Sequence, residues 1–238
     1  MNKLYESSRQ WPEAVLRLLY PPRCLICRKV LAASDPPGSP CCRKCQAEVP
    51  LAGLYCPWCG CFYRGPGECC PNSGPLRALF ALFFYQGEWR KMLHRLKYQG
   101  QRQLTRPLGN WLGTALLGTG WALDMVVFIP QHPRKTLHRG YNQSQLIARQ
   151  VAQALKLPLI PALEKIADTP SQTGLSRNER QKNIVGTFAL LKALPPGKTV
   201  LLIDDIYTTG ATMKEAAAVL SRSRVKVYGA VAAFQAHT

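Results

Sequence analysis

The chain has 238 residues, 47% of them hydrophobic, and a formal net charge of +18 at pH 7. This length allows one buried α/β core with about 70 residues left for a smaller module, and the charge favours polyanionic partners such as nucleic acid or phosphorylated metabolites. The charge is uneven: residues 1–75 hold 9 Lys and Arg against 5 Asp and Glu, a net +4, and residues 76–238 hold 22 against 8, a net +14.

The N-terminal segment, residues 1–22, does not have the features of a secretory signal peptide. It contains Glu6 and Glu13 and lacks an uninterrupted apolar core of about 7–15 residues. The apolar residues after Pro12 predict one or two turns of amphipathic helix. Only residues 107–123 approach transmembrane length without a charge, but they include four glycines and fall short of about 20 residues. We therefore expect a cytoplasmic protein without a membrane span.

All ten cysteines lie between positions 24 and 70, which indicates that they belong to one cysteine-rich module. Two residues separate Cys24 from Cys27 and Cys42 from Cys45, the spacing that turns two thiolates toward one tetrahedral metal. Such pairs form strained disulfides but bind Zn²⁺ without strain, and a chain without a secretory signal is expected in a reducing compartment. These four cysteines are the predicted ligands of a structural zinc ion in a ribbon module, residues 23–75.

A second zinc ribbon is predicted within the same module. Cys56 and Cys59 repeat the spacing, but Asn72 stands where a second matching pair would need a cysteine. The remaining ligands stay open among four residues: Cys41, Cys61, Cys69 and Cys70, of which the last two are the first choice. The metal can replace a core that this segment is too small to build, or the ribbon can recognise nucleic acid or protein.

From residue 76 onward, short β-rich runs alternate with helical patterns. The expected strands are 81–85, 126–130, 157–163, 187–191, 199–205 and 226–234. The expected helices are 88–98, 104–118, 141–156 and 211–223. This alternation predicts an α/β domain, residues 76–238, with a parallel sheet and helices on both faces. Ligands of such sheets collect at the carboxyl ends of the strands.

The first informative strand end is TVLLIDDIYTTGAT, residues 199–212. Its loop can offer N–H and hydroxyl groups to a phosphate monoester at a helix N-terminus, through Thr208, Thr209, Gly210, Ala211 and Thr212. Asp204 and Asp205 can accept hydrogen bonds from vicinal ribose hydroxyls or help to hold Mg²⁺ indirectly. The alternative, a plain strand-to-helix turn with an Asp cap, explains one Asp and one Thr but not the whole run.

This run resembles the phosphoribosyl-diphosphate signature of type I phosphoribosyltransferases, although Tyr207 stands where the signature usually has an aliphatic residue. The resemblance implies a type I phosphoribosyltransferase-like fold. It also implies that the turn after the first core strand binds pyrophosphate through backbone amides. In this chain that turn contains Gln131 and His132, with Arg134, Lys135 and Arg139 as charge partners.

Two further stretches resemble the ComF family of competence-associated proteins. Residues 139–143, RGYNQ, are close to that family's RGFNQ run and include Gly140, Tyr141, Asn142 and Gln143. The basic stretch 165–188 resembles the family at several positions, among them Gln172, Arg180 and Asn183. Lys165 stands where the family more often has Arg, which keeps the charge but loses the bidentate fork. With LKYQG at 96–100 and the cysteine module, the resemblance covers nearly the whole chain.

The resemblance implies a phosphoribosyl-diphosphate-binding protein that also binds single-stranded DNA during natural transformation, beside an uptake helicase. Tyr141, Trp89 and Trp111 could stack bases or belong to the core. The alternative is an active transferase that moves a phosphoribosyl group to a nitrogen base, with Asp204, Asp205 and Lys165 at the reacting centre. In that enzyme the loop 165–188 folds over the site and excludes water. The sequence leaves open the activity, the acceptor base and the oligomeric state.

Overall fold

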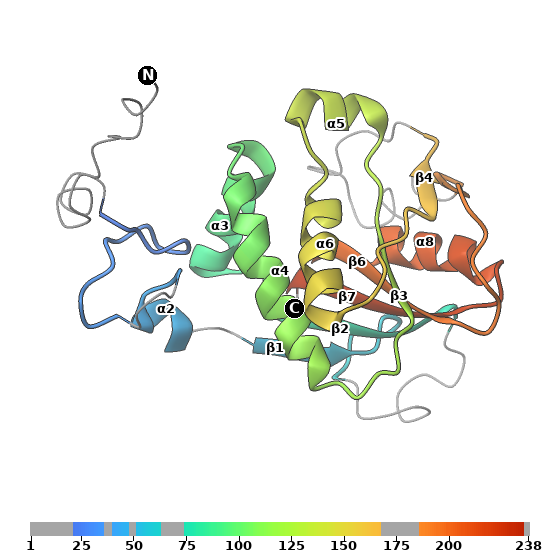
Figure 1. The fold of residues 1–238 in the computed structure, drawn as a ribbon, viewed down its shortest axis with the longest axis horizontal. Coiled ribbons are helices and arrows are strands. Elements are labelled where there is room, and N and C mark those ends of the chain that lie inside the picture. Colours follow the sequence, from blue (N-terminus) through green and yellow to red (C-terminus); the bar gives the residue numbers. More distant parts are fainter. Residues whose placement is uncertain (1–20, 36–39, 48–50, 63–73, 168–185, 236–238) are drawn as a thin grey trace, which may run out of the picture. The chain divides into compact units, whose positions relative to one another are not determined.

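A computed structural model describes residues 21–35, 40–47, 51–62, 74–167 and 186–235 of the chain (Figure 1). By its contacts the chain divides into two compact units, residues 1–49 and 50–238. The predicted helix after Pro12 lies outside the described residues. Within the described ranges, no helix is long and apolar enough to cross a bilayer.

The described residues of the small unit form a hairpin-like turn and a short helix, α2 (Arg43–Ala47). The turn is closed by a bridge between Arg23 and Val30. The Asp35 carboxylate accepts hydrogen bonds from the backbone N–H groups of Arg43 and Ala32, both at 2.8 Å, and these bonds hold the pKa of that carboxyl below its usual range. Asp35 thereby fixes the start of α2, because it satisfies an N–H group that has no partner inside the helix.

The large unit is organised by a five-stranded sheet in the order β1-β2-β7-β6-β3. Its strands are β1 (Leu51–Tyr55), β2 (Leu76–Phe84), β3 (Met125–Phe128), β6 (Thr199–Tyr207) and β7 (Lys226–Phe234). The pairs β2–β7, β7–β6 and β6–β3 are parallel, and only β1 runs antiparallel to its neighbour. The parallel sheet predicted from the alternating pattern is confirmed.

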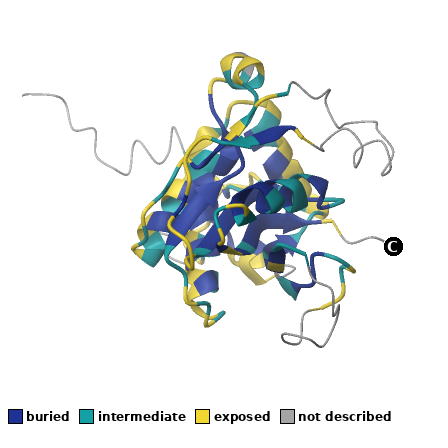
Figure 2. Ribbon diagram, turned by 90° about the vertical axis from the view of Figure 1, so that its right-hand side faces the viewer, coloured by how far each residue is buried: buried dark blue, intermediate teal, exposed yellow. Residues whose placement is uncertain are grey.

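Helices cover both faces of the sheet, as predicted. Helix α6 (Gln143–Leu155) packs on β6 and β3, and α4 (Thr105–Leu117) packs on α6. Helix α8 (Ala211–Ser221) shares a buried cluster with Val200 and Leu202. The alternating Leu201 and Ile203 are also fully buried, and they point to the other face because successive side chains of a strand alternate. The strands between the helices are accordingly the most buried part of the molecule (Figure 2).

Two of the four glycines of the apolar stretch 107–123 serve helix packing. A Cβ atom on Gly109 would lie 2.4 Å from the Cβ atom of Gln150, and one on Gly113 would lie 2.6 Å from that of Ala154. Both partners belong to α6, so the two glycines let α4 and α6 approach more closely than side chains would permit. Residues 107–117 of this stretch belong to α4, within the predicted helix 104–118, and residues 118–124 form neither helix nor strand.

Three smaller elements differ from the sequence-based expectation. The run 157–163 forms only a single bridge, Leu159 to Val126, because Pro158 and Pro161 lack N–H groups for a sheet ladder. Residues 163–165 and 188–190 pair instead as the antiparallel strands β4 (Leu163–Lys165) and β5 (Phe188–Leu190). Residues 133–139, over which the sequence pattern predicts no helix, form helix α5 (Pro133–Arg139). Helix α3 (Gly87–Tyr98) and the 3-10 turn η1 (Arg102–Leu104) are the remaining elements in the described part of the unit.

The division between the two units lies at residue 49, whereas the cysteine spacing placed the end of the ribbon module near residue 75. The reason is β1, which pairs with β2 and brings residues 51–62 into the large unit. Tyr55 at the end of β1 is buried and stacks on Phe234 of β7, with ring centroids 4.4 Å apart. The Cys56–Cys59 pair therefore belongs to the large unit.

Candidate functional site

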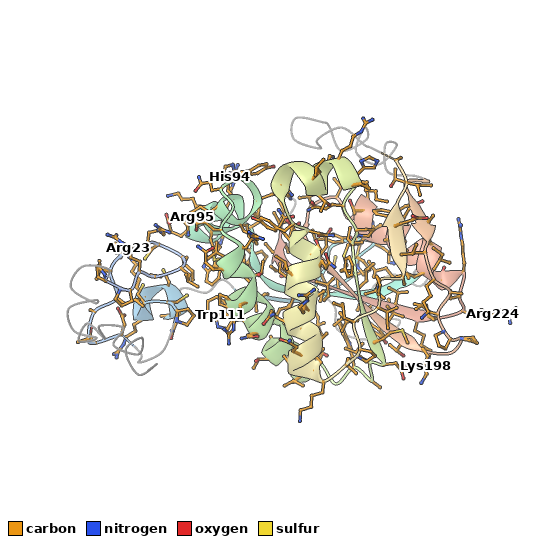
Figure 3. All side chains as sticks on the ribbon, turned by 45° about the horizontal axis from the view of Figure 1, so that its top comes forward. Arg23, His94, Arg95, Trp111, Lys198 and Arg224 are labelled. Atoms are coloured by element: carbon orange, nitrogen blue, oxygen red, sulfur yellow. The ribbon has the colours of Figure 1, made fainter. Side chains whose placement is uncertain are left out.

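A cavity of about 950 Å³ opens where the four parallel strands end. Tyr85 follows β2, the turn 129–132 follows β3, Asp204–Thr209 end β6, and Gln235 follows β7, and all of them line the cavity. Helix α3 forms a further wall that includes His94, whose place on that helix is marked in Figure 3. Six Lys and Arg side chains face two Asp carboxylates in the lining: Arg90, Lys97, Arg134, Lys135, Arg139 and Lys165. This balance favours an anionic ligand.

The acidic pair lies near the carboxyl end of β6, and each of the two residues is only 8% exposed. The Asp204 carboxylate accepts hydrogen bonds from the Ser144 hydroxyl at 2.7 Å and from the Asp205 backbone N–H at 2.9 Å. Burial raises the pKa of Asp204 to about 7, the neighbouring Asp205 carboxylate adds to the rise, and the two hydrogen bonds and Lys97 oppose it. One of the two adjacent carboxyls therefore titrates near neutral pH.

This raised pKa predicts how stability depends on pH. The stability that Asp204 contributes is fully present below its unfolded-state pKa of about 3.9 and is lost as pH rises toward 7, because the folded protein holds a proton that the unfolded chain has released. Between pH 5 and pH 7 the free energy of unfolding of the wild type should fall relative to Asp204→Asn, by at most about 1.4 kcal/mol per pH unit. Denaturant titrations followed by tryptophan fluorescence measure this difference; parallel curves would contradict the raised pKa.

The phosphate loop, residues 208–212, follows β6 and leads into α8. Gly210 has a positive φ of 76° and caps the helix, and the Ala211 N–H points to the Thr209 hydroxyl at 3.4 Å. All five residues line the cavity. The first turn of α8 and three threonine side chains are thus part of the cavity lining, an arrangement suited to a phosphate group.

The turn after β3 contributes a basic part of the lining. Gln131, His132, Arg134, Lys135 and Arg139 all line the cavity. His132 begins α5, where its Nδ1 atom accepts a hydrogen bond from the Arg134 N–H at 3.4 Å. The structure therefore brings the three predicted groups, acidic pair, phosphate loop and basic turn, around a single cavity.

The RGYNQ run holds this turn in place. Gly140 ends α5 with a positive φ of 79°, and Asn142 caps α6 while its side-chain amide donates to the Ile129 carbonyl at 3.0 Å. Gln143, which is fully buried, accepts hydrogen bonds from the side chains of Gln131 and Arg139. The Tyr141 hydroxyl donates to the Leu96 carbonyl and so ties the run to α3.

The aromatic candidates for base stacking are mostly core residues. Tyr141 is 6% and Trp89 is 5% exposed, and Trp89 packs on Phe83 with ring centroids 4.3 Å apart. Trp111 is partly exposed and contacts the edge of Trp89. Lys165 at the end of β4 lines the cavity, with its ammonium over the Phe188 ring at 5.6 Å. The family positions Gln172, Arg180 and Asn183 lie outside the described residues.

Sequence reasoning missed two residues of the site. Ser144 follows the RGYNQ run on α6 and donates to Asp204, and Lys97 of α3 lies 3.3 Å from an oxygen of Asp205. The LKYQG run at 96–100 carries only a family resemblance in the sequence, and that resemblance does not indicate this contact. No local pattern connects Lys97 with a carboxylate more than a hundred positions away.

The small unit gathers its two cysteine pairs into one cluster. The Sγ atoms of Cys24, Cys27, Cys42 and Cys45 all lie within 4.8 Å of one another, and those of Cys27 and Cys42 are 3.8 Å apart. Zn–S bonds of about 2.3 Å place tetrahedral sulfurs about 3.8 Å from one another. Although burial opposes it, backbone hydrogen bonds from Cys42, Cys27 and Ile26 lower the pKa of the Cys24 thiol to about 7. The cluster fits a structural zinc ion.

The Cys56–Cys59 turn has the backbone of the first cysteine turn. In both turns the N–H of the first cysteine donates five residues ahead, Cys24 to Lys29 at 2.8 Å and Cys56 to Cys61 at 2.9 Å. In both, the residue four positions on has a positive φ and donates back to the first cysteine. Cys69 and Cys70, the expected partners, lie outside the described residues, so the second zinc site stays a prediction.

Comparisons with known proteins agree with this architecture. The Phosphoribosyl transferase domain family matches residues 142–238, which contain the acidic pair and the phosphate loop. The DNA utilization protein YhgH of Salmonella typhimurium is 30% identical over 217 residues, covering 87% of this chain and 93% of that protein.

Competence protein F of Haemophilus influenzae is 26% identical over 222 residues, covering 87% of this chain and 95% of that protein. Among solved structures, adenine phosphoribosyltransferase from Leishmania donovani is 14% identical with a TM-score of 0.37, covering 67% of this chain and 70% of that one. By its likeness to YhgH over almost the full length of that protein, the chain belongs to the ComF/YhgH family of competence proteins and carries a phosphoribosyltransferase domain.

Proposed function

We propose that this protein binds phosphoribosyl diphosphate with Mg²⁺ in the cavity of its large unit and also binds single-stranded DNA, as a cytoplasmic factor in DNA uptake during natural transformation. The observation that carries the proposal is the cavity itself, whose lining combines an acidic pair, a Thr/Gly loop at a helix start and a basic turn. The names of two relatives, a DNA utilization protein and a competence protein, support the role in DNA handling.

Each part of the ligand has a matching part of the cavity. The 5′-phosphate would accept hydrogen bonds from the loop 208–212 and the first turn of α8. The ribose hydroxyls would donate to Asp204 and Asp205, whose oxygens also suit the hydration shell of Mg²⁺. The diphosphate would take its charge partners from Arg134, Lys135 and Arg139, three basic residues of the lining.

DNA binding is supported by the distribution of charge. Residues 76–238 carry a net +14, and five exposed basic residues flank the cysteine cluster of the small unit: Arg23, Arg28, Lys29, Arg43 and Lys44. Basic side chains that neutralise phosphates release counterions, so the affinity should fall steeply as salt increases. An uptake helicase is the partner that the family resemblance implies.

Isothermal titration calorimetry with phosphoribosyl diphosphate and Mg²⁺ tests the proposal, first alone and then with a short single strand of DNA. We expect saturable binding of the diphosphate that is lost in an Asp204→Ala/Asp205→Ala double variant. Absence of binding by the wild type would refute the cavity assignment. For DNA, the logarithm of the association constant should fall linearly with the logarithm of the salt concentration, and a flat response would refute a contact with the phosphates.

The second candidate is an active transferase, favoured by the match of residues 142–238 to the Phosphoribosyl transferase domain. In that reaction the nitrogen of an acceptor base forms a bond to C1 of the ribose while the bond from C1 to the diphosphate oxygen breaks. Lys165 and the basic turn would stabilise the departing pyrophosphate. Release of pyrophosphate in the presence of an acceptor base distinguishes this candidate, and release that persists in the double aspartate variant would refute the site assignment.

A further inference from the structure

Helix α3 adds a fixed positive charge to the acidic pair. The Lys97 ammonium lies 3.3 Å from Oδ2 of Asp205, and the Lys97 side chain is 29% and the Asp205 side chain 11% exposed. Lys97 also lines the cavity. It lies outside residues 142–238, the part that matches the transferase domain, so this lysine is a contribution of the preceding segment of the chain.

Lys97 is held in its charged form by the two carboxylates. Burial works to lower its pKa, but Asp205 and Asp204 outweigh burial, and the pKa of Lys97 is raised. Two neighbouring carboxylates in a site that is mostly closed to water repel each other and are costly without a compensating cation. Ser144 and the Asp205 N–H supply hydrogen bonds to Asp204 but no charge. Lys97 supplies a full positive charge within contact distance of the pair.

We propose that Lys97 is a built-in counter-cation that lets the acidic pair hold a pentose 5-phosphate without a divalent metal. The inference rests on the proposed binding of a phosphoribosyl group in this cavity. A divalent ion has two tasks with phosphoribosyl diphosphate: it offsets the carboxylates and it neutralises the diphosphate. Lys97 takes over the first task, so only the diphosphate half of a ligand requires Mg²⁺. Ribose 5-phosphate, which lacks that half, is then a metal-independent ligand.

The test is calorimetry of ribose 5-phosphate binding to the full-length wild-type protein, once with Mg²⁺ and once with EDTA. The EDTA is added to the zinc-containing protein shortly before the titration, so that the structural zinc is retained. We expect the two dissociation constants to agree within about 3-fold, as for a site that already contains its cation. In Lys97→Met, affinity in EDTA should fall by about 10-fold, the loss expected for one interaction between charged groups, and Mg²⁺ should restore part of it. Lys97→Arg should retain most of the metal-independent binding.

Lys91→Met is the matched control, because Lys91 lies on the same helix but is 68% exposed and pairs with Glu88 at 2.6 Å, away from the acidic pair. It should bind as the wild type does. A purely structural role of Lys97 would weaken binding equally with and without Mg²⁺, which overturns the inference. The inference is also overturned if the wild type binds ribose 5-phosphate only in the presence of Mg²⁺. This second test uses the wild type alone, so it does not depend on whether a variant folds.

The failure of the inference is distinguishable from that of the proposed function. If the wild type binds phosphoribosyl diphosphate with Mg²⁺ but binds ribose 5-phosphate only with Mg²⁺, the role of Lys97 is wrong and the function stands. If it binds neither ligand under any condition, both fall together.

Discussion

Replacing Gly210 by alanine should reduce the affinity for phosphoribosyl diphosphate by at least about 100-fold, the consequence of misplacing several phosphate contacts that are worth about 1 kcal/mol or more each. Gly210 has a φ of 76°, and a Cβ atom there would lie 2.0 Å from the Tyr207 hydroxyl oxygen and 2.3 Å from its Cζ atom. An alanine therefore meets both an unfavourable backbone conformation and a direct overlap with a neighbouring ring.

Tyr207 is not free to move aside. It is 5% exposed, its hydroxyl donates to the Pro57 carbonyl at 2.7 Å, and its ring stacks on Phe234 with centroids 5.7 Å apart. The loop rather than the ring must then shift, and the N–H groups of the phosphate loop shift with it. Stability should fall as well, by about 1–2 kcal/mol for the backbone strain and about 1–3 kcal/mol for overpacking.

Gly197 provides the matched control for this variant. Its φ is 79°, nearly that of Gly210, but a Cβ atom there would meet nothing within 4 Å. Gly197→Ala should lose about 1–2 kcal/mol of stability from backbone strain and none of the ligand affinity. In the double variant Gly210→Ala/Tyr207→Leu, which removes the overlapping ring, part of the affinity should return. If Gly210→Ala binds as the wild type does, the loop is not the phosphate site.

The part of the site that could be predicted from sequence is the part in which one continuous stretch contains both the end of a strand and the side chains that would bind the ligand. Strand β7 has the predicted bounds 226–234, and the run 199–212 forms a strand, two buried carboxylates and a helix start as expected. The pattern was sufficient because the carboxyl ends of parallel strands share one edge of a sheet, which brings the turn 130–133 to the same cavity without further information.

Contacts between distant segments could not be predicted in this way. Lys97 pairs with Asp205, and Tyr207 hydrogen-bonds to Pro57, a residue 150 positions earlier in the chain. The second contact explains why a tyrosine replaces the aliphatic residue of the signature: its hydroxyl satisfies a carbonyl of the Cys56–Cys59 turn. Beside it, the Lys214 ammonium lies over the Trp58 ring of the same turn at 4.9 Å. These partners become neighbours only because β1 joins the sheet.

Helix α5 was not predicted for a different reason, because the residues that start and end it are all local in sequence. Pro133 stands at its first turn, His132 caps it, and Gly140 ends it in the left-handed conformation. These residues favour a helix start and a helix end, but with only seven residues between them they leave no room for hydrophobic periodicity. The sequence pattern therefore predicts no helix over these residues.

Substituting Cys24 with serine should remove one equivalent of zinc and unfold the small unit. Apart from cysteines, Ile26 is the only large side chain among the described residues of that unit that is almost fully buried, so the metal must supply what a core would otherwise supply. Structural zinc contributes about 10–16 kcal/mol of apparent binding free energy to such modules at neutral pH, far more than one buried isoleucine can.

Cys41→Ser is the control, because Cys41 is as buried as Cys24 and adjoins a ligand but is not part of the four-thiol cluster. Elemental analysis should give the wild-type zinc content for Cys41→Ser and one equivalent less for Cys24→Ser, whether the protein holds one zinc ion or two. Loss of an equivalent from Cys41→Ser with retention in Cys24→Ser would show that the cluster seen here is not the one that binds the metal.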